Sequence, residues 1–143
     1  MADTPLPPHI VVINEEQETL ALFRDLLGDE GYRVSTLTYP VADLADLRIM
    51  APDLVILDMI FGGEDRGWQF LQQLRLTRAT AGLPVIVCTA AIRLIREARD
   101  ALEAMGIGVV AKPFDIDPFL AEVRRRLAEG AAPTGPSETP AGG

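Results

Sequence analysis

The sequence has 143 residues, enough for one domain with its own hydrophobic core. Its formal net charge of −8 argues against direct binding to nucleic acid, which depends on basic patches that neutralise phosphates. No apolar run approaches the roughly 20 residues of a membrane-spanning helix, and residues 1–9 lack the basic and apolar regions of a signal peptide. We therefore expect a cytoplasmic protein.

Five short apolar runs along the chain predict β-strands. They cover residues 10–13, 32–37, 54–57, 85–88 and 107–111. Three of these runs are continuous and rich in β-branched residues, which is typical of strands buried on both faces of a parallel sheet. The run at 32–37 is more mixed, so we place it at an edge of the sheet.

The stretches between these runs predict amphipathic helices. In each stretch, apolar residues recur at the spacing of one helical face: Leu20, Phe23 and Leu27; Val41, Leu44 and Leu47; Trp68, Leu71 and Leu74; Ile95, Ala98, Leu102 and Met105. Strict alternation of strand and helix predicts an α/β fold, in which helices cover both faces of a parallel sheet.

The last predicted helix is the best marked. Asp117 is expected to be its N-cap and Gly130 its stop. Its buried face is expected to consist of Ile116, Phe119, Leu120, Val123 and Leu127. Arg124, Arg125 and Arg126, near the end of this helix, are expected to face solvent.

The expected organisation is a short lead over residues 1–8, one domain over residues 9–129 and a tail over residues 130–143. The tail is rich in Gly, Ala and Pro, cannot bury a core and is expected to be disordered. Cysteine and histidine each occur once. Cys88 is predicted to be a buried thiol, and His9 to lie on the surface where the first strand begins; a lone histidine also excludes a multi-histidine metal site.

Polar side chains follow the predicted strands at their carboxyl ends, the edge at which open α/β sheets bind ligands. Asn14 and Glu15, then Glu16, follow the first strand, Asp58 ends the third and Thr89 ends the fourth. Asp58 follows four apolar residues, so its carboxylate is expected to be only partly solvated and to need a cation or a proton. An aspartate can also act as a nucleophile toward phosphorus.

Lys112 ends the fifth strand and is the single lysine among 13 basic residues. Lysine offers a compact point charge, where arginine offers a rigid fork. Such a charge suits a phosphoryl oxygen or a buried carboxylate.

Three motifs in order resemble the response-regulator receiver domain, the phosphoacceptor module of two-component signalling. They are PDLVILD at 52–58, LPVIVCTA at 83–90 and KPF at 112–114, and the resemblance covers residue 10 to about residue 127. It implies a flavodoxin-like, doubly wound five-stranded sheet of order 2-1-3-4-5. It also implies that Asp58 is the phosphoacceptor, that Thr89 bonds one phosphoryl oxygen, and that Lys112 pairs with Asp58 or another phosphoryl oxygen. Mg²⁺ would be held by Glu15, Asp58 and the backbone carbonyl of Ile60.

Three features depart from the usual pattern of that family. Asn14 and Glu15 stand where the family most often has two aspartates, which implies a weakened Mg²⁺ site to which Asn14 contributes only indirectly. The loop after Asp58 lacks the usual Met-Pro pair and is lengthened. Val109 stands where the family often has Tyr or Phe, so aromatic coupling to Thr89 is not expected.

The sequence thus predicts a stand-alone receiver that is not an enzyme. A sensor histidine kinase or a phosphotransfer protein would phosphorylate Asp58, and the domain would act by contact with a downstream protein, without nucleic acid or membrane. The identity of that protein and a homodimer through the last helices stay open. One alternative is a phosphorylation-independent receiver-like binding module, motivated by Asn14 and Glu15. Another is an aspartyl-nucleophile phosphatase, but such an enzyme would carry its nucleophile directly after the first strand, where the chain has Asn14, Glu15 and Glu16.

Overall fold

The structure is a computed structural model that describes residues 6–14, 16–38, 44–59, 64–89, 92–112 and 115–131. Strands and helices alternate along these residues, with one short 3₁₀ helix, η1, before the fourth strand: β1 (His9–Asn14), α1 (Gln17–Asp29), β2 (Arg33–Thr38), α2 (Leu44–Met50), β3 (Leu54–Met59), α3 (Glu64–Leu76), η1 (Arg78–Thr80), β4 (Val85–Thr89), α4 (Ile92–Ala104), β5 (Ile107–Ala111) and α5 (Ile116–Ala131). None of the described helices is long and apolar enough to span a bilayer.

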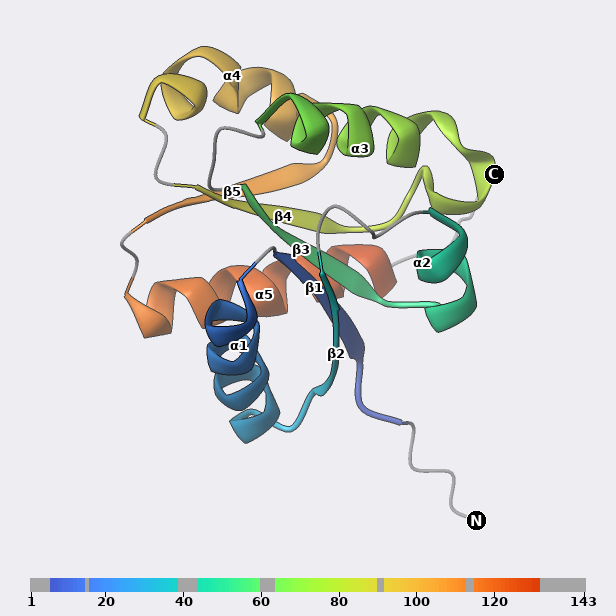
Figure 1. The fold of residues 1–143 in the computed structure, drawn as a ribbon, viewed down its shortest axis with the longest axis vertical. Helices are drawn as coiled ribbons and strands as arrows, with labels where there is room; N and C mark the ends of the chain where they lie inside the picture. Colours follow the sequence, from blue (N-terminus) through green and yellow to red (C-terminus); the bar gives the residue numbers. More distant parts are fainter. Residues whose placement is uncertain are drawn as a thin grey trace.

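The strands form a parallel sheet of order β2-β1-β3-β4-β5. This order and the edge position of β2 confirm the predictions from the sequence. Helices cover both faces of the sheet: α1 and α5 lie on one face, and α3 and α4 on the other (Figure 1). Each pair of consecutive strands is joined by a helical crossover, as a parallel sheet requires.

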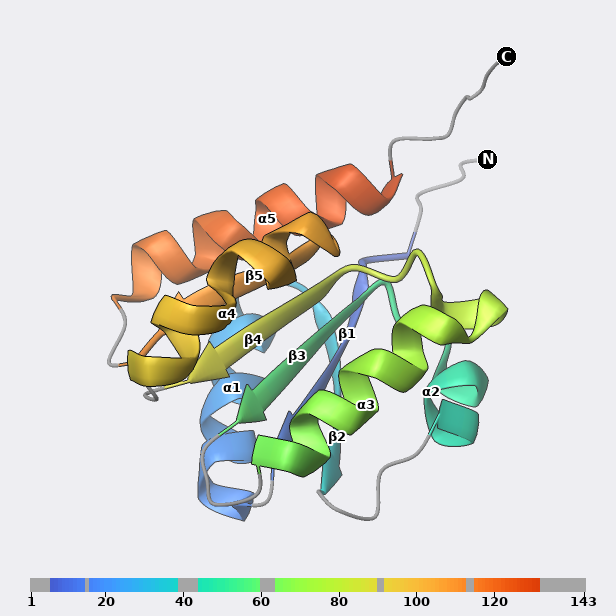
Figure 2. The same cartoon turned by 90° about the horizontal axis from the view of Figure 1, so that it is seen from above.

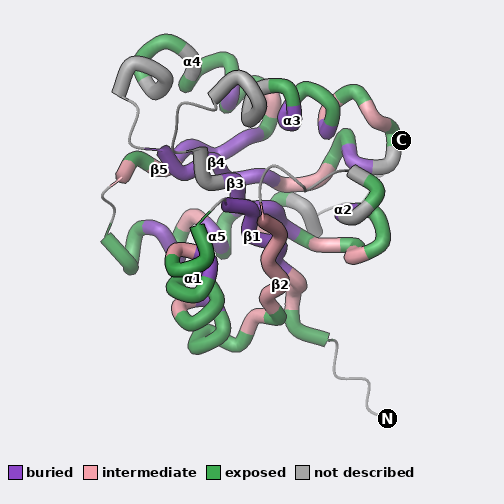
Figure 3. The backbone as a smooth tube through the Cα atoms, in the orientation of Figure 1, coloured by how far each residue is buried: buried purple, intermediate pink, exposed green. Residues whose placement is uncertain are grey.

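The sheet divides the hydrophobic core into two clusters, because successive side chains of a strand point to opposite faces. In β4, Val85 and Val87 belong to the cluster that includes side chains of α2, α3 and α4. Ile86 and Cys88 belong to the cluster that includes side chains of α1 and α5. The central strands are buried on both faces, whereas β2 is only half-buried (Figure 3). Cys88 is a buried thiol, as predicted.

The helical faces read from the sequence agree with the structure wherever their side chains are described. Buried members of these faces are Leu20, Phe23, Leu27, Leu47, Leu71, Leu74 and Leu102. Met105 lies just beyond α4 and packs against the core while partly exposed. Val41 and the side chains of Leu44, Trp68, Ile95 and Ala98 lie outside the described residues.

Three predictions about α5 were wrong at its ends. The helix begins at Ile116, so Asp117 lies inside its first turn and is not the N-cap. The carbonyl of Asp115 opens the helix by accepting the Phe119 N–H at 3.2 Å. Ile116 is 54% exposed, so Phe119 is the first side chain of α5 in the core. The helix also continues through Gly130 to Ala131, and residues 132–143 lie outside the described part of the chain.

The prediction that all three arginines of α5 are solvated was also wrong. Arg124 and Arg125 are exposed, but Arg126 is only 5% exposed. Arg126 Nε donates to Glu122 Oε2 at 2.8 Å, and its Nη1 donates to Glu129 Oε1 at 3.3 Å. Burial of this guanidinium is possible because it is paired with carboxylates.

Gly108 of β5 makes the room for this buried ion pair. A Cβ atom at position 108 would collide with Glu122 Oε2 and would lie only 2.8 Å from Arg126 Nε. The ion pair therefore packs directly on the backbone of β5.

His9 is half-buried and hydrogen-bonded, which corrects its predicted place on the surface. Its Nδ1 donates to the Met50 carbonyl at 3.1 Å, and its Nε2 is hydrogen-bonded to Ser35 Oγ at 2.7 Å. Its backbone N–H donates to Asp53 Oδ2 at 2.8 Å. The ring thus ties β1 to β2 and to the end of α2, partners that are distant in sequence.

Candidate functional site

The pairing register brings the carboxyl ends of the strands together as the sequence predicts. Asp58 is opposite Cys88, Met59 is opposite Thr89, and Thr89 is opposite Ala111. Paired strands lie about 4.8 Å apart, so the backbones of these residues are immediate neighbours. Figure 2 shows β3 and β4 ending on the same side of the sheet.

Asn14 reaches the same level of the sheet from β1. Ile13 is opposite Leu57, so the next residues of the two strands, Asn14 and Asp58, are neighbours at the end of the sheet. Asp58 therefore stands between Asn14 on one side and β4 on the other.

Lys112 and Thr89 are linked through the backbone. The Lys112 N–H donates to the Thr89 carbonyl at 2.8 Å, which extends the pairing of β4 and β5 past Ala111. Thr89 is 1% exposed, and the Lys112 side chain is half-buried. A hydroxyl and a cation from two strands are thereby held at the end of the sheet where Asp58 lies.

Asn14 is fully buried and shapes the turn that follows β1. Its Oδ1 accepts the backbone N–H of Glu16 at 2.7 Å, the side-chain turn for which asparagine is well suited. Glu16 in turn accepts the Thr19 hydroxyl at 2.9 Å, so its carboxylate serves the start of α1. Of the two acids that follow β1, Glu15 therefore stays the predicted metal ligand.

Several predicted site residues lie outside the described part of the structure. These are Glu15 and Ile60, the side chain of Asp58, and the loop at 60–63 whose length departs from the family pattern. Their roles stay predictions. Val109 is described and is 7% exposed in the core cluster that faces α4.

The donor set predicted from the sequence suits Mg²⁺ by its chemistry. Two carboxylates, a backbone carbonyl and a buried amide are all oxygen donors, which hard cations prefer. The Oδ1 of Asn14 already accepts a backbone N–H, and this fits an indirect role toward the cation.

Comparison with known proteins gives a consistent family. The profile of the response regulator receiver domain matches residues 10–124. The chain is 29% identical to the DNA-binding dual master transcriptional regulator RpaA of Synechocystis, over 84% of the chain and 49% of the relative. It is 31% identical to the phosphate regulon transcriptional regulatory protein PhoB of Rhizobium meliloti, over 84% of the chain and 52% of the relative. The chain thus spans about half the length of these relatives.

Solved structures agree with this result. The receiver domain of nitrogen regulatory protein C superposes with a TM-score of 0.72 at 26% identity, over 87% of this chain and 98% of that one. The chemotaxis response regulator CheY4 of Vibrio cholerae has the same fold, with a TM-score of 0.70 at 20% identity over 84% of this chain and 98% of that one. Receiver domains are signalling modules that generally bind Mg²⁺ in an acidic pocket. The family match over residues 10–124 agrees with the strand order and with the residues at the strand ends. This chain therefore belongs to the response regulator receiver domains of two-component signalling.

Proposed function

We propose that the domain is a phosphoacceptor that carries a phosphoryl group on Asp58. A sensor histidine kinase or a phosphotransfer protein supplies the group, and the domain passes the signal on by contact with a separate protein. The observation that supports this function best is the register that brings Asp58, Thr89 and Lys112 to one end of three adjacent strands.

The proposed transfer is a nucleophilic displacement at phosphorus. A carboxylate oxygen of Asp58 forms a bond to the phosphorus while the bond from phosphorus to the donor's imidazole nitrogen breaks, and that nitrogen keeps the electron pair. The product is an acyl phosphate. Lys112 and Thr89 neutralise and hydrogen-bond the phosphoryl oxygens, and such positioning and charge stabilisation account for most of the catalysis in this type of reaction.

In this proposal Mg²⁺ is held by Glu15, Asp58 and the Ile60 carbonyl, and Asn14 acts through a water molecule. When bound, the cation offsets the negative charge of the carboxylates and the phosphoryl oxygens. The protein residues set the position of the attacking oxygen and the charge around it.

A phosphorylation-independent binding module is the second candidate. The observation in its favour is Asn14, a neutral and fully buried residue that contributes to a turn at the place where an aspartate is usual. Incubation with acetyl phosphate and Mg²⁺, followed by intact mass, separates the two functions. A gain of one phosphoryl group supports the phosphoacceptor, and no gain at any Mg²⁺ concentration supports the binding module.

The substitution Asn14→Asp should tighten Mg²⁺ binding by about three- to tenfold and speed phosphorylation at limiting Mg²⁺. An added charge near the cation in a partly screened site contributes about 1 kcal/mol, which sets that range. Aspartate also keeps an oxygen that can accept the Glu16 N–H, so the turn after β1 should persist. Calorimetric titration measures the affinity, and Trp68 of α3 offers a fluorescence signal.

Gln72→Glu is the matched control for this substitution, because it adds the same charge at an exposed position of α3. It should leave Mg²⁺ affinity unchanged. An affinity that is equal or weaker in the Asn14→Asp protein would refute the proposed indirect role of position 14.

A further inference from the structure

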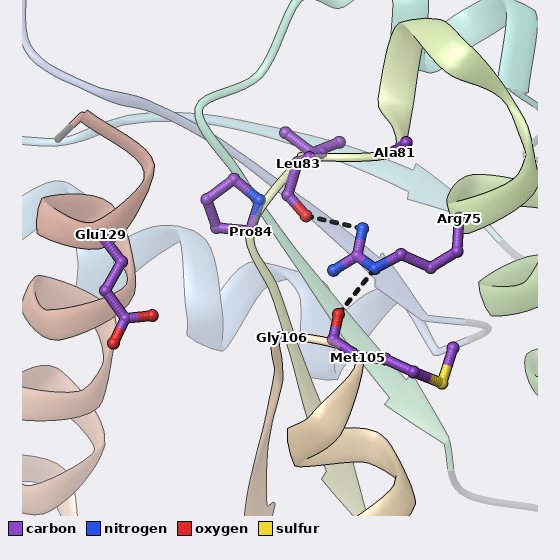
Figure 4. A pocket seen from close by; sticks show the side chains of 8 residues that line it. Arg75, Ala81, Leu83, Pro84, Met105, Gly106 and Glu129 are labelled. Atoms are coloured by element: carbon purple, nitrogen blue, oxygen red, sulfur yellow. Dashed lines mark hydrogen bonds between the residues drawn. The ribbon is translucent and has the colours of Figure 1, made fainter. Parts of the chain in front are cut away.

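A cavity of about 210 Å³ lies at the end of the sheet where β4 and β5 begin. Its walls come from the end of α3, the segments that lead into β4 and β5, and the end of α5 (Figure 4). Leu83 lies just before β4 and Gly106 just before β5, whereas Thr89 ends β4 and Lys112 follows β5. The cavity is therefore at the opposite end of the sheet from the proposed phosphoacceptor site.

Arg75 presents a fixed guanidinium to this cavity. Its Nε donates to the Met105 carbonyl at 2.9 Å and its Nη1 donates to the Leu83 carbonyl at 2.9 Å, which fixes the plane of the group. Among the described residues no hydrogen bond uses Nη2, and no carboxylate forms an ion pair with Arg75. Figure 4 shows Nη2 pointing into the cavity.

The charge of Arg75 is only partly compensated. The side chain is half-buried, and burial lowers its pKa below the usual value because the charged form loses hydration. Backbone carbonyls replace some of that hydration with partial charges. A full negative charge at Nη2 would therefore be stabilised more strongly than at an exposed arginine.

Glu129 lies on the opposite wall, but its negative charge is offset within α5. Its carboxylate is 3.5 Å from Arg125 Nε and 3.3 Å from Arg126 Nη1. The cavity is thus locally positive in a protein whose net charge is −8. The rest of the wall is mainly apolar and includes Leu83, Pro84 and Met105.

We propose that this cavity binds a small carboxylate. Its oxygens would accept the two N–H groups of Arg75 Nη2, and a short hydrocarbon chain would lie against Leu83, Pro84 and Met105. Arginine binds carboxylates through charge-assisted hydrogen bonds, and ligand sites usually combine such a polar anchor with apolar walls. A volume of about 210 Å³ has room for a carboxylate with a short hydrocarbon chain.

The experiment is a titration of the full chain with sodium butyrate, followed by the backbone amide NMR signals of Gly82 and Gly106, which line the cavity. We expect saturable shifts at these glycines with a Kd on the order of millimolar, as suits so small a ligand. Sodium chloride at equal ionic strength and butyramide, a neutral analogue of butyrate, should not produce them.

Two substitutions should change this affinity in opposite directions. Arg75→Lys keeps the charge but loses the fork, and we expect butyrate to bind about tenfold more weakly. Glu129→Gln removes a negative charge from the opposite wall, and we expect about twofold tighter binding. Arg78→Lys, at an exposed arginine of η1, is the matched control and should have no effect. If Arg75→Lys does not fold, the tightening by Glu129→Gln still tests the site.

A bound carboxylate could also come from the chain itself, and Glu138→Gln in the full chain distinguishes this source. If Glu138→Gln shifts the signals of Gly82 and Gly106 without added butyrate and also tightens butyrate binding, Glu138 is the carboxylate that occupies the site. Absence of these shifts, with saturable butyrate binding, would support a free carboxylate. The proposal is overturned if butyrate produces no saturable shift up to about 100 mM, or if butyramide binds equally well.

Discussion

Asp58→Asn should abolish the mass gain that acetyl phosphate and Mg²⁺ produce in the unmodified protein. The amide is a poor nucleophile and carries no charge to attract the cation, so both the acceptor and a metal ligand are lost. Asp53→Asn is the matched control, because Asp53 stands just before β3, at the opposite end of the strand from Asp58. That variant should gain one phosphoryl group, as the unmodified protein does.

Persistent labelling of the Asp58→Asn protein would show that another residue accepts the phosphoryl group. Tryptic mapping of the labelled protein would then identify that residue. Circular dichroism of both variants should match the unmodified protein, since neither substitution changes the volume of the side chain.

Gly108→Ala should lower the free energy of unfolding by about 1–3 kcal/mol, the usual cost of forcing an added group into a packed site. The added methyl group must displace either Glu122 or Arg126, whose ion pair rests on the Gly108 backbone. If the displacement separates the pair, Arg126 keeps only Glu129 as a partner, and the loss should lie at the upper end of this range. Urea denaturation measures the difference.

Gly28→Ala is the matched control for this loss of stability. Gly28 lies in α1, and a Cβ at this position would have no atom within 4 Å. Alanine in a helix avoids the entropy cost of glycine, so this variant should gain about 0.5–1 kcal/mol. If Gly108→Ala and Gly28→Ala change the free energy of unfolding equally, the ion pair does not restrict the side chain at position 108.

Much of the fold follows from short-range patterns in the sequence. Continuous β-branched runs such as the one at 85–88 are typical of strands inside a parallel sheet, and the polar mixture at 32–37 suits an edge. Helical spacing identified the buried residues of α1 because one apolar stripe must face the sheet. In α3 it identified Leu71 and Leu74 but missed the buried Phe70. The order of the strands came from the family resemblance, since local periodicity carries no information about which strands are neighbours.

The errors arose where a distant residue decides the environment. Three consecutive arginines indicate a solvated helix face, and only the missing side chain of Gly108, on another element, makes burial of Arg126 possible. His9 precedes an apolar run and gives no local sign of its bonds to Ser35 and Met50. Composition alone could not reveal these contacts.

The candidate site was predictable to the level of the strand ends. Because parallel strands end on one side of a sheet, the positions of Asn14, Asp58, Thr89 and Lys112 in the sequence were sufficient to bring them together. The backbone hydrogen bond between Lys112 and Thr89 depends on atomic geometry, and so does the turn that the Asn14 side chain stabilises. Sequence spacing could not supply that geometry.

The alternation of side chains along β4 gives any signal from the proposed site a preferred direction. Val85 and Val87 face the layer of α3 and α4, and Thr89 has the same parity in the strand. Cys88 faces the layer of α1 and α5. A displacement of the Thr89 side chain would therefore disturb α3 and α4 first, and the sheet would shield α1 and α5 from it.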